Sequence, residues 1–502
     1  MKLFWTITSF LVLPLAILSC SEKLEQPDTD ITGPSVLPTV PEPETPEWEE
    51  GQYGKDFIWN DARIPQIKIC VAKDVWDRFL ENCDSNPCTS GYFKCSVVFQ
   101  NEVIKDSVTV AALRLRDNTD LFYKGQDFRP EGTAGQKHGE STAWNMSNYE
   151  LSFTKFSSKL AHTLRAVDGI ILKSCRNDPS YSRERYCHDL CKRIGLWTAP
   201  RNSFCRLSIH VTGDASPVYL GIYQMIEPVN SSYVTDRMEH FRWTAGNTWK
   251  CNTGANLSII TESSFTTDTG TGMASPYMLV NNHNTFGTAK SQLKEFIRKI
   301  NTLSRNDFHT WIQEVCDVRL LMYTFAVSAV TGNWEDYWNM GQNYYMYFNT
   351  THLSDYKVYF IPHRFDVSLG NIRIDYMMDP ARQNPYTWGK QSSTLMVRLM
   401  SYPDFRQMYT EALESLISED HGHFNKESGP HSIKSYMYRI SFYTANDTGK
   451  MNSAKDMTAP WSNSYGYRYN LTDPDSEYNF FKVRDEVIRQ AILEESISST
   501  HN

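Results

Sequence analysis

Four runs near the start of the folded region alternate apolar and polar residues with the two-residue period of half-buried strands. They are rich in β-branched and aromatic residues and cover 65–72, 95–100, 107–116 and 149–153. Between the last two runs, residues 124–147 are rich in glycine and polar side chains, which predicts a loop. This part of the chain is therefore expected to be mainly β-sheet.

The later part of the chain places apolar residues at the spacing of helices. The pattern predicts helices over 289–303, 307–330, 405–417 and 480–493. Residues 270–287, rich in Gly, Thr, Ser and Asn, have the composition of an insertion or lid, and a plain disordered loop is the favoured interpretation. The sequence shows no second proline-rich linker and no internal repeat, so residues 51–502 are expected to form one α+β unit, β-rich over about 51–240 and more helical over about 241–502.

The first twenty residues have the pattern of a lipoprotein export signal. Lys2 precedes an apolar run over 3–18, and residues 17–20 are Ile-Leu-Ser-Cys, so residues 1–19 are expected to be removed and Cys20 to carry lipid. An ordinary signal peptide or a single membrane helix is the alternative, but the run is short and contains Pro14. Residues 20–50 follow as an acidic, proline-rich tether whose composition cannot bury a core.

The negative charge of the chain is concentrated in this tether, where residues 21–50 contain nine acidic residues and one lysine. The net charge of the whole chain is −8, so residues 51–502 are nearly neutral. A neutral body without a basic stripe argues against nucleic acid as the main partner. Membrane contact is expected through the lipid anchor only.

The cysteine count fits an exported protein. There are eleven cysteines, and removing Cys20 leaves an even number that is compatible with disulfides. Cys83 and Cys88 bracket a polar turn and form the best local candidate for a bridge. Cys187 and Cys191 share a helix face, where either a zinc site or a pair of buried thiols is possible, and the buried thiols are favoured.

The densest group of candidate catalytic residues lies between residues 332 and 370: Glu335, Asp336, Asn343 and Asp366. Residues 344–348 and 358–361 have the composition of paired strands, which predicts a hairpin with Asn343 before it and Asp366 after it. In phosphoryl transfer one carboxylate orients the acceptor hydroxyl, while a second carboxylate and an asparagine hold Mg²⁺. A helix cap or a surface charge is the alternative for each carboxylate.

Several segments follow one another in a characteristic order: LRLRDN (113–118), a strand, turn and helix over 168–196, VYLGIYQMIEPVNSSYVTDR (218–237), the stretch from 332 to 370, SYPDFRQMY (401–409) and FFKVRDEVI (480–488). This order resembles the CotH family, the spore-coat-type atypical kinases that also occur as bacterial surface lipoproteins. The similarity runs from about residue 64 to residue 492. The acidic Glu22 and Glu25 also resemble the surface-export signals of Bacteroidetes lipoproteins.

The resemblance implies a bilobal, atypical protein-kinase-like fold with a β-rich N-lobe and a more helical C-lobe. It implies phosphoryl transfer from ATP, with Mg²⁺ or Mn²⁺, to a hydroxyl group of an unknown protein substrate. Glu335 or Asp336 would then be catalytic, Asn343 and Asp366 would be metal ligands, and Glu227 would face the nucleotide pocket.

Two basic residues are further candidates for nucleotide contacts. Arg116 and Lys173 lie at the ends of predicted strands, from which they could contact phosphates. Structural ion pairs with Asp178 or Glu227 are the alternative. No Ser-His-Asp arrangement, Walker P-loop or HExxH motif occurs, which argues against a hydrolase or metalloprotease.

The chain also departs from the family pattern. Arg364 stands where the family commonly has an acidic residue, and Asp117 stands where it has glycine. A guanidinium cannot ligate a metal, so Arg364 would either replace one ion by a fixed charge or abolish metal binding. The alternative function is therefore a catalytically inactive surface module that binds glycans or partner proteins. The two are expected to differ in whether Glu335 or Asp336, Asp366 and Asn343 surround one cavity.

Overall fold

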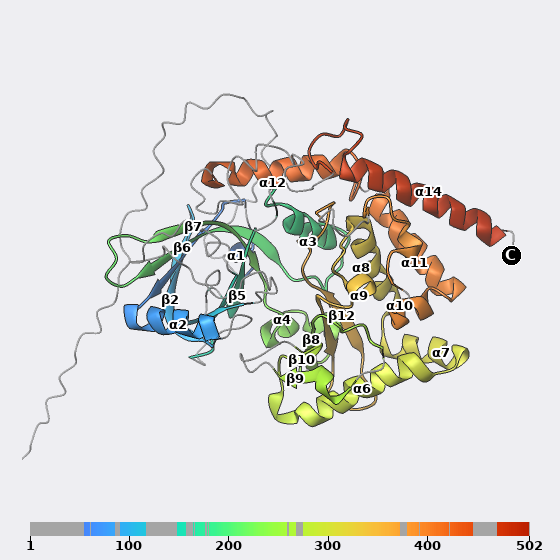
Figure 1. Ribbon diagram of the computed structural model, residues 1–502, viewed down its shortest axis with the longest axis horizontal. Helices are drawn as coiled ribbons and strands as arrows, with labels where there is room; N and C mark the ends of the chain where they lie inside the picture. Colours follow the sequence, from blue (N-terminus) through green and yellow to red (C-terminus); the bar gives the residue numbers. More distant parts are fainter. Residues whose placement is uncertain are drawn as a thin grey trace, which may run out of the picture. The chain divides into compact units, whose positions relative to one another are not determined.

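A closed seven-stranded barrel forms the first part of the computed structural model (Figure 1). The structure describes residues 55–500 except 61, 86–90, 117–147, 157–163, 165, 176–177, 179, 259–260, 268–274, 372–378, 391, 421 and 445–468. The barrel strands are β1 (Gln66–Val71), β2 (Phe93–Gln100), β3 (Lys105–Leu115), β4 (Tyr149–Ser152), β5 (Gly169–Ser174), β6 (Asn202–Val211) and β7 (Val218–Ile226). Their order is β1-β2-β3-β4-β5-β7-β6, and the parallel pairing of β1 with β6 closes the ring.

The alternating pattern of the strands fills this barrel with apolar side chains. Ile67 and Ile69 of β1, and Leu113 and Leu115 of β3, belong to one buried core together with Trp76 of α2 (Lys73–Ser85). The four predicted strands are confirmed, with bounds that differ by one or two residues. The expected β-rich region is thus present, and its closure into a barrel was not predicted.

A second sheet has the order β12-β11-β8-β10-β9. Its strands are β8 (Asn247–Cys251), β9 (Phe265–Thr267), β10 (Tyr277–Leu279), β11 (Tyr344–Phe348) and β12 (Val358–Pro362). The prediction of a plain loop was wrong over the described residues 275–287, because Tyr277 and Leu279 of β10 are fully buried against this sheet and α6 already begins at Phe286. A three-residue strand is too short for its alternation to stand out from the surrounding polar residues.

Helices surround the second sheet and share a separate apolar core with it (Figure 1). They include α3 (Arg183–Arg193), α6 (Phe286–Thr302), α7 (Arg305–Val315), α8 (Val318–Thr331), α10 (Thr394–Leu399), α11 (Pro403–Ile417), α12 (Ser428–Thr444) and α14 (Phe480–Thr500), with the short α9 (Tyr337–Met340). The short α1 (Lys55–Ile58) belongs to the barrel core, and α4 (Ser231–Asp236) and α5 (Met238–Phe241) form a third apolar cluster with β11 and β12. α8 packs against α11, α3 and β12. These observations establish the α+β class.

One predicted helix was wrong in its continuity. The run 307–330 forms two helices, α7 and α8, because the chain becomes extended at Cys316 and Asp317. The Asp317 side chain accepts a hydrogen bond from Leu320 N at 3.0 Å and so caps the start of α8. The helical period continues through the break, which hides it in the sequence.

Several predictions lie outside the described residues, namely the export signal, Cys20, the tether, the loop over 124–147, Asp117 and Cys88. The Cys83–Cys88 bridge therefore stays a prediction. Cys187 and Cys191 are fully buried in the apolar core, so the alternative of buried thiols is confirmed. Within the described residues, no helix is long and apolar enough to cross a membrane.

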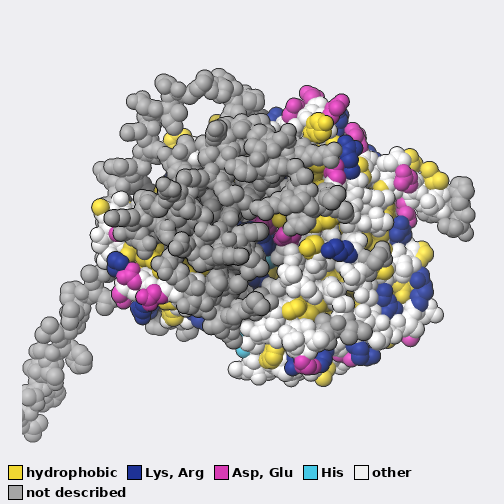
Figure 2. All heavy atoms as spheres, in the orientation of Figure 1, with side chains coloured by type: hydrophobic (Ala, Val, Ile, Leu, Met, Phe, Trp, Pro, Cys, Tyr) yellow, Lys and Arg dark blue, Asp and Glu magenta, His cyan; other side chains and the backbone are white. Residues whose placement is uncertain are grey.

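Charged side chains of both signs are interspersed on the coloured part of the face in Figure 2. On α2, Lys73 pairs with Asp77 at 2.7 Å, and on α6, Lys290 pairs with Glu262 at 2.9 Å. In each of these pairs the two opposite charges neutralise each other. That nucleic acid is not the main partner stays a prediction.

Candidate functional site

The β11–β12 hairpin positions the residues that the sequence singled out between 332 and 370. Its strands are antiparallel, with Tyr344 opposite Pro362 at the open end, so the predicted hairpin is confirmed. Asn343 therefore precedes one strand and Asp366 follows the other at the same end of the hairpin.

The two loops at this open end are held against each other by backbone hydrogen bonds. Trp334 N donates to Val367 O at 3.0 Å, and Leu369 N donates to Thr331 O at 2.7 Å. Gly332 ends α8 at φ +64°, a left-handed conformation that glycine adopts without a steric penalty. The fold thus brings the loop that carries Glu335 beside the loop after β12.

Glu335 and Asn343 contact each other directly. The Asn343 Nδ2 atom donates to Glu335 Oε2 at 3.2 Å and to the Glu335 carbonyl at 3.1 Å. Asn343 has φ +59°, a left-handed conformation that asparagine tolerates better than most residues. The predicted catalytic glutamate and the predicted metal-binding asparagine therefore form one unit.

Asp336 is buried and caps the short helix α9. Its side chain accepts a hydrogen bond from Asn339 N at 2.7 Å, and only 5% of the residue is exposed. Burial raises the pKa of this carboxyl from its ordinary 3.8 to about 7, although the Asn339 N–H stabilises the ionised form. A carboxyl that titrates near neutral pH is suited to proton transfer, but the capping contact gives it a structural function as well.

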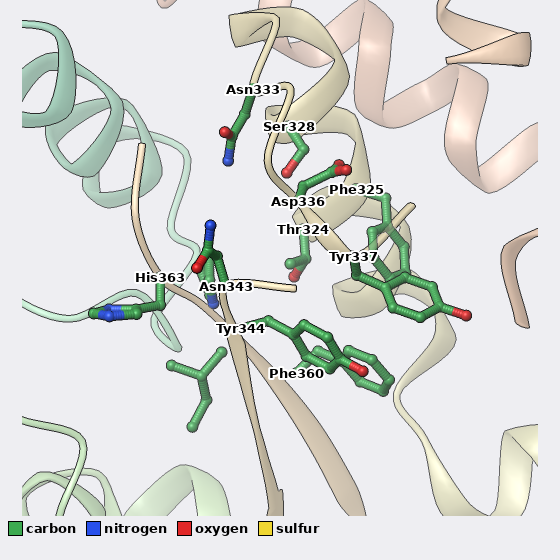
Figure 3. A pocket seen from close by; sticks show the side chains of 12 residues that line it. Thr324, Phe325, Ser328, Asn333, Asp336, Tyr337, Asn343, Tyr344, Phe360 and His363 are labelled. Carbon is green, nitrogen blue, oxygen red and sulfur yellow. The ribbon is translucent and has the colours of Figure 1, made fainter. Parts of the chain in front are cut away.

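A small cavity separates Asp336 from the hairpin (Figure 3). Its volume is about 20 Å³, and Asn333, Asn343, Ser328 and His363 are among the residues that line it. The carboxamides of Asn333 and Asn343 are turned toward each other across it (Figure 3). This space suits one water molecule and is far too small for a nucleotide. Its lining includes Asp336 and Asn343 but neither Glu335 nor Asp366, so the expected single cavity is only partly formed.

A buried ion pair joins the barrel to the helical part of the chain. Lys173 of β5 contacts Glu184 of α3 at 2.5 Å from Nζ to Oε2. Ile170 and Leu172 of the same strand face the barrel core, so the alternation of the strand directs Lys173 to the outer face. Glu184 lies in the first turn of α3, where an acidic side chain is favoured by the helix dipole.

Asp366 completes this cluster. Lys173 Nζ lies 3.0 Å from Asp366 Oδ1, while Arg364 approaches Oδ1 with Nε at 3.2 Å and Oδ2 with Nη2 at 2.9 Å. The four side chains Lys173, Glu184, Arg364 and Asp366 are called the Lys173 cluster below. Asp366 is its most exposed member, with 24% of its side chain accessible against 4–13% for the others.

Opposite charges control the protonation of Asp366 and Lys173, whereas burial dominates at Glu184 and raises its pKa. Burial by itself would raise the pKa of Asp366, but Arg364 and Lys173 hold it well below its usual range. Burial would lower the pKa of Lys173, but Asp366 and Glu184 raise it. Asp366 is therefore ionised and Lys173 is protonated at neutral pH.

A divalent ion does not fit Asp366 in this arrangement. Mg²⁺ takes about six oxygen ligands at roughly 2.1 Å, usually including one or two carboxylates. Both carboxylate oxygens of Asp366 already accept hydrogen bonds from cationic groups, which would repel a further cation. Among the described residues, no three His, Cys, Asp or Glu side chains form a group that could hold a metal.

Arg116 has different partners from those predicted. It donates to Glu150 Oε2 at 2.8 Å and to the Tyr345 hydroxyl at 2.7 Å, and Glu150 also pairs with Arg114 at 2.8 Å. Burial alone would raise the pKa of Glu150, but the two arginines lower it to about 2. The predicted pairing of Arg116 or Lys173 with Asp178 or Glu227 was wrong. Asp178 instead pairs with Arg183 at 2.6 Å, which fixes the start of α3.

Glu227 follows β7 and is held by two arginines. Arg201 Nη1 contacts Glu227 Oε1 at 2.6 Å, and Arg237 Nη2 contacts Oε2 at 2.7 Å. Arg201 N donates to the same carboxylate at 3.0 Å. Glu227 thus ties the end of β7 to the start of β6 and to the residue that follows α4.

The sequence reasoning did not single out Glu184 or Asn333. Glu184 follows Lys173 by eleven residues, and a strand lysine followed by a helical glutamate is a pattern known from protein kinases. That pattern could have identified it. Asn333 donates to the Arg364 carbonyl at 3.1 Å, a contact with no sequence signal because it joins two distant loops.

A sequence model of the family described as CotH kinase protein matches residues 130–476, which is more than half of the chain. The segments at 113–118 and 480–488 lie outside this match. No curated protein matches the chain.

Proposed function

Because the chain belongs to the CotH kinase protein family, we propose that it binds ATP and transfers a phosphoryl group to a protein hydroxyl. The observation that carries this proposal is the Lys173 cluster. Protein kinases position the nucleotide phosphates with a strand lysine that pairs with a helical glutamate, beside an aspartate that follows a β-hairpin. Lys173, Glu184 and Asp366 have these positions, which supports a bilobal kinase-like organisation around them.

In this proposal Lys173 contacts the nucleotide phosphates, and Glu184 keeps its amino group in place. Glu335 orients or deprotonates the acceptor hydroxyl, and its contact with Asn343 fixes its direction. Asp336 is the alternative base, since its pKa of about 7 leaves it partly ionised at neutral pH. A divalent ion, Mg²⁺ or Mn²⁺, is expected from the family, but no step is assigned to it because it does not fit Asp366.

The second candidate is a non-catalytic surface module that binds glycans or partner proteins. The observation that favours it is the bidentate contact of Arg364 with Asp366, which occupies the carboxylate that the family resemblance assigns to metal binding. In that case the chain would retain the fold without phosphoryl transfer.

Two measurements on the purified full-length chain distinguish the candidates. ATP should raise the melting temperature, because a ligand that binds only the folded state stabilises it, and Lys173→Met, which removes the proposed phosphate contact, should abolish the shift. Label from γ-phosphate-labelled ATP should then reach protein hydroxyls, and Glu335→Gln should stop it. Stabilisation without transfer to any offered protein would favour the non-catalytic module, and no stabilisation would contradict the nucleotide site itself.

Export to the outer membrane or cell surface with a lipidated Cys20 is part of the proposal. Mass spectrometry of the membrane fraction should find an acylated amino-terminal Cys20. The variant Cys20→Ala should remain unlipidated and leave the membrane fraction.

A further inference from the structure

The Lys173 cluster contains two cationic side chains and two carboxylates, and burial raises the pKa of one of these carboxylates, Glu184. Lys173 and Arg364 are cationic, and Glu184 and Asp366 are the two carboxylates. An acidic side chain at position 364 would change the charge of the cluster by two units, which is the charge of one divalent ion. Arg364 therefore supplies locally the positive charge that such an ion would bring.

The guanidinium also occupies the place where an ion would bind. Nε and Nη2 of Arg364 lie 3.2 and 2.9 Å from the two oxygens of Asp366, the bidentate geometry in which arginine binds carboxylates most strongly. The side chain of Arg364 is only 13% exposed, so this contact is shielded from solvent. Such a pair is retained in water-poor surroundings, where opposite charges attract strongly.

The backbone around Arg364 is held in an unfavourable conformation. Its φ is +64°, a value that non-glycine residues rarely adopt and that persists only when neighbouring contacts enforce it. The Arg364 carbonyl accepts from Asn333 Nδ2 at 3.1 Å, and the next residue, Phe365, donates from its N–H to Glu184 Oε1 at 3.4 Å. These contacts hold the backbone of residues 364 and 365, from which the Arg364 side chain reaches Asp366.

The cluster is accessible from one side. The side chain of Asp366 is 24% exposed, whereas that of Glu184, the other carboxylate paired with Lys173, is 4% exposed. A polyphosphate bound here would contact Lys173 and Arg364, whose side chains are 10% and 13% exposed, beside the carboxylate of Asp366, whose charge they compensate. Phosphate groups are bound well by fixed arginine and lysine side chains.

We propose that Arg364 takes the place of a divalent cation, so that this chain binds the polyphosphate of ATP without metal. The inference rests on the proposed nucleotide site and goes beyond it in removing the metal requirement. A site of this kind would also bind ADP without metal, because the cation belongs to the protein.

The test compares ATP binding to the full-length chain in EDTA and in Mg²⁺, measured by isothermal titration calorimetry. The expected result is binding in EDTA with an affinity within about threefold of that in Mg²⁺. Binding in Mg²⁺ alone would overturn the inference and leave the nucleotide site standing. No binding in either buffer would contradict the proposed nucleotide site, and the inference with it.

Variants at position 364 distinguish the effect of its charge on ATP binding from a loss of folding. Arg364→Asp should lose binding in EDTA by at least tenfold and recover it in Mg²⁺, whereas Arg364→Gln should weaken binding in both buffers. The matched control is Arg298→Asp, which makes the same charge change at a 56% exposed side chain of α6 and should bind like the wild type. If Arg364→Asp does not fold, the Gln variant decides, and its unchanged affinity in EDTA would overturn the inference.

Discussion

Glu227 and Asp366 were both singled out in the sequence, and in the structure each is a carboxylate held by two cationic side chains. The partners of Glu227 are Arg201 and Arg237, and a backbone N–H of Arg201 also binds it. The partners of Asp366 are Arg364 and Lys173, and Lys173 is shared with a second carboxylate on α3. The chemistry is similar, but the surroundings differ.

The difference distinguishes a carboxylate that stabilises the fold from one that belongs to the candidate functional site. Glu227 uses its oxygens to join the ends of neighbouring elements, and its side chain is 7% exposed. Asp366 is more exposed and lies beside the loop that carries Glu335. Its partners are Arg364, from the same loop after β12, and Lys173, from β5 of the barrel. A buried carboxylate with two cations is therefore not by itself a sign of function.

The largest expected effect comes from removing one cationic side chain beside each of the two carboxylates. Lys173→Met and Arg237→Met each remove a side chain that is 10% exposed from a buried pair, and each should lower the free energy of unfolding by about 3–5 kcal/mol. Only Lys173→Met should also abolish ATP binding. Urea unfolding and calorimetry check both effects, and equal loss of ATP binding in the two variants would contradict the distinction.

The next effect concerns the loop beside Asp366. Glu335→Gln should lower phosphoryl transfer by at least about 100-fold, because a positioned base typically contributes that much. ATP affinity should stay within about twofold, since Glu335 contacts Asn343 and is not assigned to the phosphates. Rates from labelled ATP, set against calorimetric affinities, test this. A rate loss that is matched by a loss of affinity would instead assign Glu335 to binding.

A pH series tests the neighbouring Asp336. Its pKa is about 7 in the folded state against an ordinary 3.8, so the folded state binds the proton more tightly than the unfolded state. Its contribution to stability is complete below pH 4 and is lost as the pH rises to about 7, by about 1.4 kcal/mol for each pKa unit. Asp336→Asn keeps the helix cap and should remove this decline. Unfolding curves between pH 4 and 8 measure the difference, and parallel curves for the two proteins would contradict the raised pKa.

The smallest expected effect on the free energy of unfolding concerns Glu227, the carboxylate that stabilises the fold. Glu227→Gln keeps hydrogen-bond acceptance but removes the charge that two arginines share, so it should cost about 1–2 kcal/mol of unfolding free energy. ATP affinity should not change. Calorimetry that showed a loss above about threefold would place Glu227 at the nucleotide instead.

Local pattern was a good guide to the elements and to the hairpin at residues 344–361. Strand alternation located β1 to β4, and the apolar spacing located α6, α11 and α14. It missed β10, which is only three residues long, and it joined α7 to α8, because the cap at Asp317 does not disturb the helical period. Both errors arise because a short strand and a local helix cap leave the periodic pattern almost unchanged.

For the candidate site, the sequence identified the types of residues and left their partners undecided. Asn343 and Asp366 were predicted to flank the hairpin, and they do. The partners of Arg116 and Lys173 were predicted wrongly, because ion pairs form between residues far apart in the chain. Lys173 meets Asp366 only after the barrel and the helical core have formed.

By itself the sequence determined the α+β class, the family, the placement of acidic residues at the open end of one hairpin and the presence of Arg364 beside Asp366. Those features depend on short-range pattern and on residue order, which a sequence carries directly. Only the tertiary structure decided that the barrel closes, that Glu184 supports Lys173, and that Arg364 turns its guanidinium onto Asp366. The physical reason is that burial and distance set the energy of each ion pair, and both arise only when remote segments pack together.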